Sequence, residues 1–287
     1  MIFFFGHGRL GNQLFQYSFI KSVEDKEQRI ISYNFEDLVE LFDAIPNVTN
    51  IKNRALKKLI TKLAVPLLEF LAKKSFISSY KVDTYNENGF EVPDITYTKI
   101  EGLLPVVYVY PCFAQSEAFF RKNIVNKLVM KKRYEESAGN FLASIPAKYN
   151  KVFVHVRRGD YAHFSVLGRM DVSLPDTYYQ NTIHWYEAHV ENPFFVFLTD
   201  DPEFVENRFK NVLNKAISRN PMFVDFAIMT QCEYGIMSNS SFAWWAAYMM
   251  KNRKKVFAPK YWLGWKSEVE YHKGITPTFA ESIEVKR

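Results

Sequence analysis

Short apolar segments alternate with helix-like segments along the second half of the chain, and this alternation constrains the fold more than any other feature. The apolar segments predict buried strands over 152–156, 194–198, 234–237 and 256–258, and a short extended segment over 222–224. Helical spacing of apolar residues predicts helices over 175–190, 202–209, 226–232 and 241–251. Strands that alternate with helices form a mostly parallel sheet. Because ligands of such sheets bind beyond the carboxyl ends of the strands, the residues after each strand are the functional candidates.

The first half of the chain opens in the same way. A buried-type strand over 2–5 is followed by a glycine-rich turn, a helix over 12–23 and a strand over 29–33. A chain of 287 residues is long enough for two domains of this kind. We place the seam at 144–146, after a helical stretch over 113–142. The sequence therefore predicts an α/β fold with an N-terminal domain of residues 1–145 and a C-terminal domain of residues 146–287.

Composition excludes several classes of protein. Hydrophobic residues make up 48% of the chain and charged residues 24%, as in globular proteins. Two cysteines are too few for a disulfide scaffold or a cysteine-rich zinc module, and they favour a reducing compartment. No signal peptide and no spanning helix is expected, because the apolar runs are too short. The net charge of +6 favours an anionic partner: nucleic acid, a phosphorylated small molecule or a membrane surface.

A glycine motif, GHGRLG over 6–11, follows the first predicted strand and matches the G-x-G-x-x-G pattern of dinucleotide-binding turns. Glycines at such a turn let backbone amides approach a phosphate at a helix N-terminus. Asn12 and Gln13 follow where small apolar residues are usual, and Tyr33 and Asn34 stand where a ribose-binding acid is expected. The motif favours a phosphate-proximal loop, with a structural turn and nicotinamide binding as alternatives.

Two adjacent arginines, Arg157 and Arg158, follow the strand over 152–156, and His155 lies at its end. Arginine is rarely buried unpaired, and guanidinium is the preferred group for bidentate phosphate recognition. Successive side chains leave a strand in opposite directions. One arginine is therefore expected to face a ligand while the other pairs with an acid such as Asp160. A surface ion pair and a core histidine are the alternatives for these residues.

Polar residues also follow the next two strands. Asp200 and Asp201 precede Pro202, which favours capping of the next helix over Mg²⁺ binding, and no obligatory metal is expected. The run Ser238-Asn-Ser-Ser241 precedes an aromatic helix, and small polar residues at a helix N-terminus suit an anion.

Residues 51–74 form a basic amphipathic pattern that Pro66 is expected to kink or split. Seven apolar residues fall on one predicted face: Leu56, Leu59, Ile60, Leu63, Leu67, Phe70 and Leu71. Lysines are interleaved with them. The face is predicted to pack on the body of the protein, with contact to an anionic membrane as the alternative.

Three blocks together resemble glycosyltransferase family 11, the α-1,2-fucosyltransferases. They are GRLGNQLFQYSF at the N-terminus, HVRRGDY in the centre and SNSSFAWWAAYM further on, and FLTDD and DFAIMTQCEYGIMSNSS also look like the family's pattern. The resemblance implies a GT-B-like fold of two Rossmann-type domains facing across a cleft. It implies inverting, metal-independent transfer of L-fucose from GDP-β-L-fucose to the 2-hydroxyl of a galactoside. The donor is expected on the C-terminal domain and the acceptor on the N-terminal domain.

The resemblance also implies roles for single residues. By similarity, Arg157 is the principal phosphate ligand, Arg158 supports it, His155 lies near the base, Asp225 contacts the guanine and Ser241 the pyrophosphate. The further donor-binding candidates are Ser240, Gly11 and Asn12. The acceptor candidates are Gln13 and Asp171, and the candidates for the general base are His7, Asp160 and Asp171.

The family resemblance places this chain in the cytoplasm, as a bacterial-type enzyme of surface-glycan or O-antigen synthesis. A lipid-linked acceptor would bring it to the inner face of the cytoplasmic membrane, with peripheral contact through residues 51–74. An NAD(P)-dependent oxidoreductase is the alternative that the glycine motif supports. A nucleic-acid-binding protein is not expected, because the notable arginines gather at one strand end and no recognition motif is evident.

Overall fold

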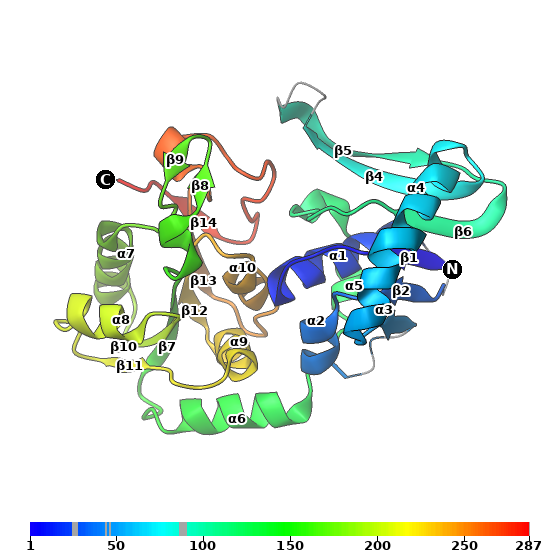
Figure 1. Ribbon diagram of the computed structural model, residues 1–287. Helices are drawn as coiled ribbons and strands as arrows, with labels where there is room; N and C mark the ends of the chain where they lie inside the picture. Colours follow the sequence, from blue (N-terminus) through cyan, green and yellow to red (C-terminus); the bar gives the residue numbers. More distant parts are fainter. Residues whose placement is uncertain (25–27, 44, 46, 86–90, 287) are drawn as a thin grey trace. The chain divides into compact units, whose positions relative to one another are not determined.

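The computed structural model describes residues 1–24, 28–43, 45, 47–85 and 91–286, which form two compact units, Met1–Met130 and Lys131–Arg287 (Figure 1). Each unit contains a six-stranded sheet in which most neighbouring strands are parallel. Helices are interleaved with the strands along the chain. The predicted α/β fold class is confirmed.

The N-terminal unit is built on a sheet with the strand order β3-β2-β1-β6-β4-β5. Its pairs are parallel, except that β4 and β5 form an antiparallel pair. The strands are β1 (Ile2–Phe4), β2 (Ile30–Ser32), β3 (Val48–Asn50), β4 (Ile77–Tyr85), β5 (Glu91–Ile100) and β6 (Leu104–Val109). The helices are α1 (Leu10–Val23), α2 (Glu36–Leu41), α3 (Arg54–Leu59), the π-helix η1 (Ile60–Ala64), α4 (Val65–Lys73), the 3-10 helix η2 (Glu117–Phe119) and α5 (Lys122–Val125).

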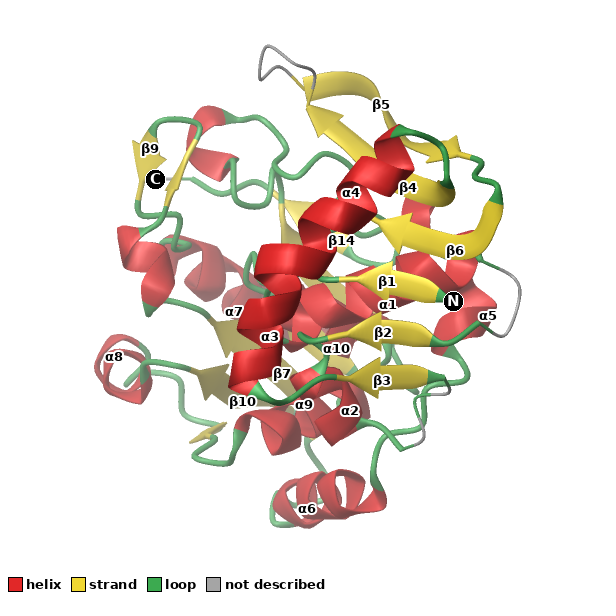
Figure 2. Ribbon diagram, turned by 45° about the vertical axis from the view of Figure 1, so that its right-hand side comes forward, coloured by secondary structure: helices red, strands yellow, loops and turns green. Residues whose placement is uncertain are grey.

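Strand β1 is covered on both faces, as its uninterrupted apolar run predicts. Ile2 and Phe4 are fully buried, and the Phe4 ring stacks on Phe35 at the start of α2. The alternate side chains, Phe3 and Phe5, join the core beneath α4. Because side chains alternate along a strand, helices must cover both sides of this sheet. In Figure 2 the segment α3–α4 crosses one face and α1 lies behind the other.

The C-terminal unit has an all-parallel six-stranded sheet in the order β11-β10-β7-β12-β13-β14. Its strands are β7 (Asn150–Val156), β10 (Pro193–Thr199), β11 (Lys215–Ile217), β12 (Tyr234–Ile236), β13 (Lys255–Pro259) and β14 (Glu281–Ile283), and a separate hairpin pairs β8 (Ser165–Val166) with β9 (Arg169–Met170). The helices are α6 (Lys132–Ala143), α7 (Asp176–His189), α8 (Pro202–Arg208), α9 (Met222–Gln231), α10 (Ser241–Tyr248) and the 3-10 helices η3 (Asp160–His163) and η4 (Trp265–Ser267).

The strand order of this second sheet determines where a ligand can bind. The chain runs from β7 outward to β10 and β11, then returns to β12 on the other side of β7. The connections leaving β7 and β12 therefore diverge, which opens the sheet at their carboxyl ends. A doubly wound sheet binds its ligands at such a switch point.

Hydrogen bonds from buried tyrosines connect helix α7 to this sheet. The hydroxyl of Tyr178 donates to the carbonyl of Met237 at 2.8 Å. The hydroxyl of Tyr186 lies 3.0 Å from the carbonyl oxygens of both Gly235 and Lys255, on β12 and β13. Because buried polar groups cost free energy unless they are hydrogen-bonded, these contacts fix α7 against the strands.

Some predicted elements differ from the structure. The extended segment expected over 222–224 is wrong, because these residues form the first turn of α9 after Pro221, and the short strand lies earlier, at β11. The predicted helix over 113–142 is only partly correct, since it is divided into η2, α5 and α6. Helix α6 packs against α9 and belongs to the C-terminal unit, so the units divide ahead of the seam that we placed at 144–146.

Residues 54–73 form one helical segment of mixed type. The break expected at Pro66 takes the form of the π-helical turn η1, and Pro66 stands in the first turn of α4. Within the part of the chain that the structure describes, no helix combines the length and the apolar character needed to cross a membrane.

Two glycines of the C-terminal unit provide a matched test of this packing. A Cβ at Gly235 on β12 would overlap the Phe153 ring of β7, whereas a Cβ at Gly139 in α6 would make only ordinary contact, 3.6 Å from Gln231. Gly235→Ala should lower the free energy of unfolding by about 1–3 kcal/mol. Gly139→Ala should raise it by about 0.5–1 kcal/mol, because alanine is the better helix former. Urea unfolding of both variants measures this, and equal effects would contradict the strand register.

Candidate functional site in the C-terminal unit

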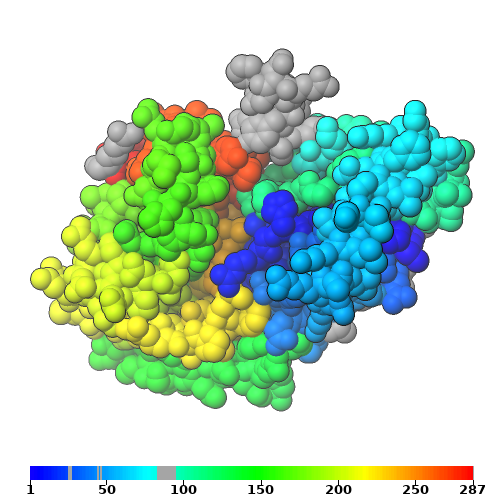
Figure 3. All heavy atoms as spheres, viewed as in Figure 1, coloured from blue at the N-terminus to red at the C-terminus, as the bar shows by residue number. Residues whose placement is uncertain are grey.

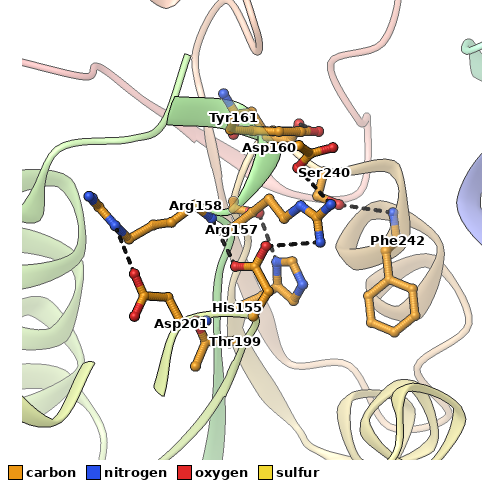
Figure 4. Close-up of polar contacts among 12 residues, drawn as sticks. His155, Arg157, Arg158, Asp160, Tyr161, Thr199, Asp201, Ser240 and Phe242 are labelled. Carbon is orange, nitrogen blue, oxygen red and sulfur yellow. Dashed lines mark hydrogen bonds and ion pairs between the residues drawn. The ribbon is translucent and has the colours of Figure 1, made fainter. Parts of the chain in front are cut away.

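The arginines and the serine-rich turn meet at the switch point of the second sheet. Arg157 and Arg158 follow β7, and the turn 238–240 follows β12, the strand paired with β7. A hydrogen bond of 2.8 Å between Nδ1 of His155 and the hydroxyl of Ser238 joins the two strand ends. The structure thus brings together two groups of residues that are far apart in the sequence (Figure 4).

The guanidinium of Arg157 is held between two carboxylates. Its Nη2 atom lies 2.7 Å from Oδ1 of Asp160, and its Nη1 atom lies 3.0 Å from Oδ2 of Asp200. The guanidinium also lies over the Tyr161 ring, 5.5 Å from its centroid. Figure 4 shows the side chain extending toward Ser240 and the start of α10. These contacts fix a positive charge at the carboxyl end of β7.

Arg158 leaves the chain in the opposite direction. Its Nε atom lies 3.6 Å from Oδ2 of Asp201, and its guanidinium lies over the Phe204 ring of α8 at 3.8 Å. The expected divergence of the two arginines is confirmed (Figure 4). The expected pairing was different, because Asp160 pairs with Arg157, the arginine that points toward the serine-rich turn. Asp201 also caps α8, as predicted, by accepting a hydrogen bond of 3.1 Å from the Phe204 amide.

Asp200 approaches the backbone so closely that a Cβ at Gly159 would displace its carboxylate. Its Oδ1 atom accepts a hydrogen bond of 3.0 Å from the Arg158 amide, while Oδ2 contacts Arg157. A Cβ on Gly159 would lie 2.5 Å from that Oδ2 atom. Gly159 therefore permits one carboxylate to fix both the Arg157 guanidinium and the backbone of the next residue.

His155 is buried, and its imidazole is held neutral. Burial, together with the neighbouring positive charge of Arg157, lowers the pKa of His155 to about 3. Its ring lies 5.6 Å from that of Phe242 on α10. A neutral imidazole in this position can exchange hydrogen bonds with Ser238 without adding charge to the site.

The N-terminus of α10 faces the same place. The Ser240 hydroxyl accepts a hydrogen bond of 3.3 Å from the Phe242 amide, which is the expected N-cap, and Ser241 is the first helical residue. Asn239 is fully buried and donates to the Val172 carbonyl at 2.8 Å, while Tyr161 donates to the Asn239 carbonyl at 3.2 Å. The positive end of the helix dipole thus lies on a rigid turn.

Two further candidates lie elsewhere in the C-terminal unit. Asp225 is in the first turn of α9, where its carboxylate accepts a hydrogen bond from the Ser218 hydroxyl, and burial raises its pKa to about 6. The next residue, Phe226, contacts Phe242 of α10 with ring centroids 5.3 Å apart. Asp171 follows β9, and its Oδ1 atom accepts a hydrogen bond of 3.1 Å from the Ser173 amide.

The N-terminal candidates lie in and after the loop 6–11, which side-chain amides hold from within. Gln13 is buried, and its amide bonds to the Gly8 carbonyl at 3.1 Å and to the Leu38 amide at 2.9 Å. Asn12 accepts a hydrogen bond of 2.6 Å from Gln115, and Gly11 is buried in the first turn of α1. The His7 side chain is exposed, and its ring packs edge-on against Phe113.

A carboxylate already occupies the helix end that the glycine motif would offer to a phosphate. The amide of Leu10, the first residue of α1, donates to Asp37 at 3.0 Å, and burial raises the pKa of Asp37. The Leu10 amide is therefore already hydrogen-bonded within the protein, and the structure gives no support to an NAD(P)-dependent oxidoreductase.

A comparison with protein-family models identifies the chain. The model of glycosyl transferase family 11 matches residues 1–272. The chain belongs to this family.

Relatives of this family 11 chain include two glycosyltransferases of very different sources. It is 25% identical over 202 residues to galactoside 2-alpha-L-fucosyltransferase SEC1 of Bos taurus, covering 66% of the chain and 52% of the relative. It is 29% identical over 118 residues to O-antigen biosynthesis glycosyltransferase WbnK of Escherichia coli, covering 39% of each. The chain thus spans about half the length of the bovine protein.

The fold of the family 11 chain is GT-B-like, because its structural neighbours are fucosyltransferases of that fold. One is NodZ alpha-1,6-fucosyltransferase soaked with GDP-fucose, with a TM-score of 0.52, 10% sequence identity, and coverage of 87% of this chain and 92% of the neighbour. At that identity the likeness establishes the fold alone. Among the residues described, no group of three or more His, Cys, Asp or Glu side chains is arranged to hold a metal ion.

Three residues that contact the candidate site residues or the start of α1 are not predicted in these roles from the sequence of this family 11 chain: Asp200, Tyr161 and Asp37. The sequence predicts Asp200 as a helix cap or metal ligand, whereas its carboxylate contacts Arg157 and the Arg158 amide. Tyr161, which lies beneath the Arg157 guanidinium, has no predicted role. Asp37 at the start of α1 has no predicted role either. The strand-end position is the available signal for Asp200, and closeness in sequence to Arg157 is the signal for Tyr161. The contact of Asp37 with Leu10 is long-range and leaves no local pattern.

The buried neutral histidine predicts a pH dependence of stability. Unfolded His155 takes up a proton below about pH 6.5, while the folded protein resists protonation down to about pH 3. Stability should therefore fall as pH drops below 6.5, by about 1.4 kcal/mol per pH unit for this group. His272, whose burial lowers its pKa to about 4, acts in the same direction.

His155→Asn places an amide near the Nδ1 position without a titrating group. It should reduce the loss of unfolding free energy between pH 7.5 and pH 5 by about 2 kcal/mol relative to the parent. Urea unfolding at both pH values measures the difference. The same loss in parent and variant would contradict a neutral His155 in the folded state.

Proposed function

We propose that the chain is a galactoside α-1,2-fucosyltransferase that transfers L-fucose from GDP-β-L-fucose to the 2-hydroxyl of a galactoside, with inversion at the anomeric carbon. Family membership and the likeness to fucosyltransferase folds support this activity. The observation that carries it is the Arg157 guanidinium, which is fixed by Asp160 and Asp200 at the switch point and directed toward the N-terminus of α10.

In this proposal the donor domain is the sequence-based domain of residues 146–287, which lies within the C-terminal unit Lys131–Arg287. Arg157 binds the β-phosphate, Arg158 supports it, and Ser240 and Ser241 present the first turn of α10 to the diphosphate. His155 lies near the base, and the carboxylate of Asp225 accepts hydrogen bonds from the guanine edge. The N-terminal unit serves the acceptor, with Gln13 as a positioning residue because its amide is bonded within the loop. Gly11 and Asn12 close over the sugar-phosphate, and Asp171 contacts the acceptor.

The chemistry that follows is a single displacement. The oxygen of the acceptor 2-hydroxyl attacks C1 of fucose, and the bond between C1 and the β-phosphate oxygen breaks with its electron pair on GDP. Negative charge grows on the diphosphate as the sugar becomes cation-like. Arg157 and the N–H groups of α10 stabilise this charge more in the transition state than in the ground state, which lowers the barrier. We propose that no metal is required, because the guanidinium supplies the charge.

The proton of the acceptor hydroxyl needs a base, and Asp160 already has another partner. Because Asp160 is ion-paired with Arg157, we propose that it positions the guanidinium, which leaves His7 and Asp171 as candidate bases. The pH–rate profiles of His7→Ala and Asp171→Asn distinguish them, since the acidic limb is lost only in the variant that lacks the base.

For the cellular setting, we propose cytoplasmic synthesis of a surface glycan or O-antigen. The likeness to WbnK supports this role, and both cysteines of the chain are free thiols. The acceptor would then be a galactoside on a lipid carrier at the inner face of the cytoplasmic membrane. Incubation with GDP-fucose and a lactose-type acceptor in EDTA, followed by linkage analysis, tests the reaction and its metal independence.

Arg157 provides the sharpest mutational test. Arg157→Ala should lower kcat by about 10²–10⁴-fold at saturating GDP-fucose, because it removes charge stabilisation of the leaving diphosphate. Arg157→Lys should fail as well, since one ammonium cannot reproduce the fork that Asp160 and Asp200 hold.

The matched control is Arg208→Ala, which removes an exposed arginine paired with Asp176 in the same unit. It should keep near-parental kcat. Near-normal turnover of Arg157→Ala would remove the phosphate-binding assignment. A thermal shift with NAD(P) but none with GDP would revive the oxidoreductase.

A further inference from the structure

The helical segment α3–α4, residues 54–73, exposes a row of apolar side chains that no part of its own unit covers. Five large side chains recur along it at spacings of three and four residues, each more than two-fifths exposed: Leu56, Leu59, Leu63, Leu67 and Phe70. Residues at these spacings lie on one face of a helix. Figure 3 shows the segment, in light blue to cyan, on the surface facing the viewer.

The segment has a second apolar face, which accounts for its packing on the protein. Leu68 and Ala72 are buried in the core formed with Phe5 and Tyr108, and Leu71 is packed against it. The inward face is thus complete without the five exposed residues. The expectation that one apolar face holds all of these residues against the body is wrong: the structure divides them between an inward and an outward face.

The apolar surface continues beyond the end of the helix. Phe76 is 45% exposed, and the neighbouring turn adds Leu103 and Leu104, which are 84% and 51% exposed. The Leu104 amide donates to the Phe76 carbonyl at 2.9 Å, so this turn lies directly beside the helix end. Single exposed leucines are ordinary, but a contiguous apolar patch marks an interaction surface. We call these eight residues the apolar stripe.

The charge around the stripe identifies its partner. Residues 51–74 contain seven lysines and arginines and one acid, Glu69, whose carboxylate accepts a hydrogen bond from Tyr108 on the inward side. Lys58 and Lys62 are exposed, and each directly precedes a leucine of the stripe. Lys73 and Lys74 are exposed at the end of the helix, close to Phe76. An apolar stripe with a basic border matches an anionic lipid surface.

We propose that α3–α4 docks the protein on an anionic membrane, with the apolar stripe inserted at the boundary between headgroups and acyl chains and the lysines on the headgroups. A second copy of the chain fits this surface less well, because two basic faces would be brought together. The proposal stands on the N-terminal unit alone and does not depend on the fucosyltransferase assignment.

Flotation with phosphatidylglycerol-containing vesicles tests the proposal. The parent should float with these vesicles and not with pure phosphatidylcholine, and 0.5 M NaCl should weaken the association. Lys58→Glu/Lys62→Glu should weaken partitioning by about tenfold or more. Leu63→Gln/Leu67→Gln should abolish partitioning to the vesicles. The side chains of the lysine pair and of the leucine pair are exposed, so both variants should keep the fold intact. The matched control, Lys122→Glu/Lys127→Glu, reverses the charge of two exposed lysines in and just after α5 (Lys122–Val125) and should float like the parent.

Three outcomes would overturn the proposal. They are failure of the parent to float with anionic vesicles, equal loss in the α5 control, and self-association that Leu63→Gln/Leu67→Gln abolishes without any vesicle binding. Fucose transfer to a soluble galactoside, measured on the same variants, should remain at the parental rate. Failure of membrane docking is therefore distinguishable from failure of the proposed reaction.

Discussion

The ion pairs of Arg157 are the interaction on which the candidate site depends. An arginine side chain that moved freely would lose much of its ability to stabilise charge, because ordering it would cost conformational entropy during the reaction. Here Asp200, with 26% of its side chain exposed, is the more deeply set partner, and Asp160, with 67% exposed, is the outer one. An incoming diphosphate would therefore compete with Asp160 for the guanidinium, while Asp200 keeps it in place. Gly159 makes this possible, since a side chain there would displace Asp200.

The sheet topology explains why this charge lies beside a helix N-terminus. Because β7 and β12 are neighbours but their connections run in opposite directions, the loops after them do not cross and the space at their ends remains accessible. The bond between His155 and Ser238 joins the two ends, and the imidazole is neutral beside Arg157. Two positive charges in that buried position would repel each other. Burial keeps the histidine neutral in the first place, and the same arginine adds to this effect.

The sequence predicts those parts of this arrangement that arise from local patterns. The strand end at 156, a second strand end within one residue of 236, the divergence of two adjacent arginines and the capping of α8 and α10 by polar residues all follow from periodicity and capping chemistry. The contacts of Asp200 and Asp37 are tertiary: the strand-end position of Asp200 indicates a site residue but not its partner, and Asp37 has no local signal. The glycine motif shows the difference: its spacing matches a phosphate loop, but Asp37, which is remote in sequence, occupies the helix end. Likewise, the apolar run over 222–224 predicts a short extended segment, whereas in the structure Pro221 is the N-cap of α9 and these residues form its first turn.

The segment α3–α4 marks a further boundary of what periodicity can predict. A helical projection places Leu67 close to Leu71, and both count as one apolar face when only the sequence is known. In the structure the sheet beneath accommodates the side that carries Leu68 and Ala72, and the π-helical turn η1 precedes Pro66 between the two α-helical parts. The remaining apolar side chains have no sheet left to cover them within their unit. Amphipathicity therefore predicts that such a helix packs against an apolar surface. Only the packing in the structure reveals that the helix has two apolar faces, one inward and one outward. The lysines that border the outward face then determine what that face can bind.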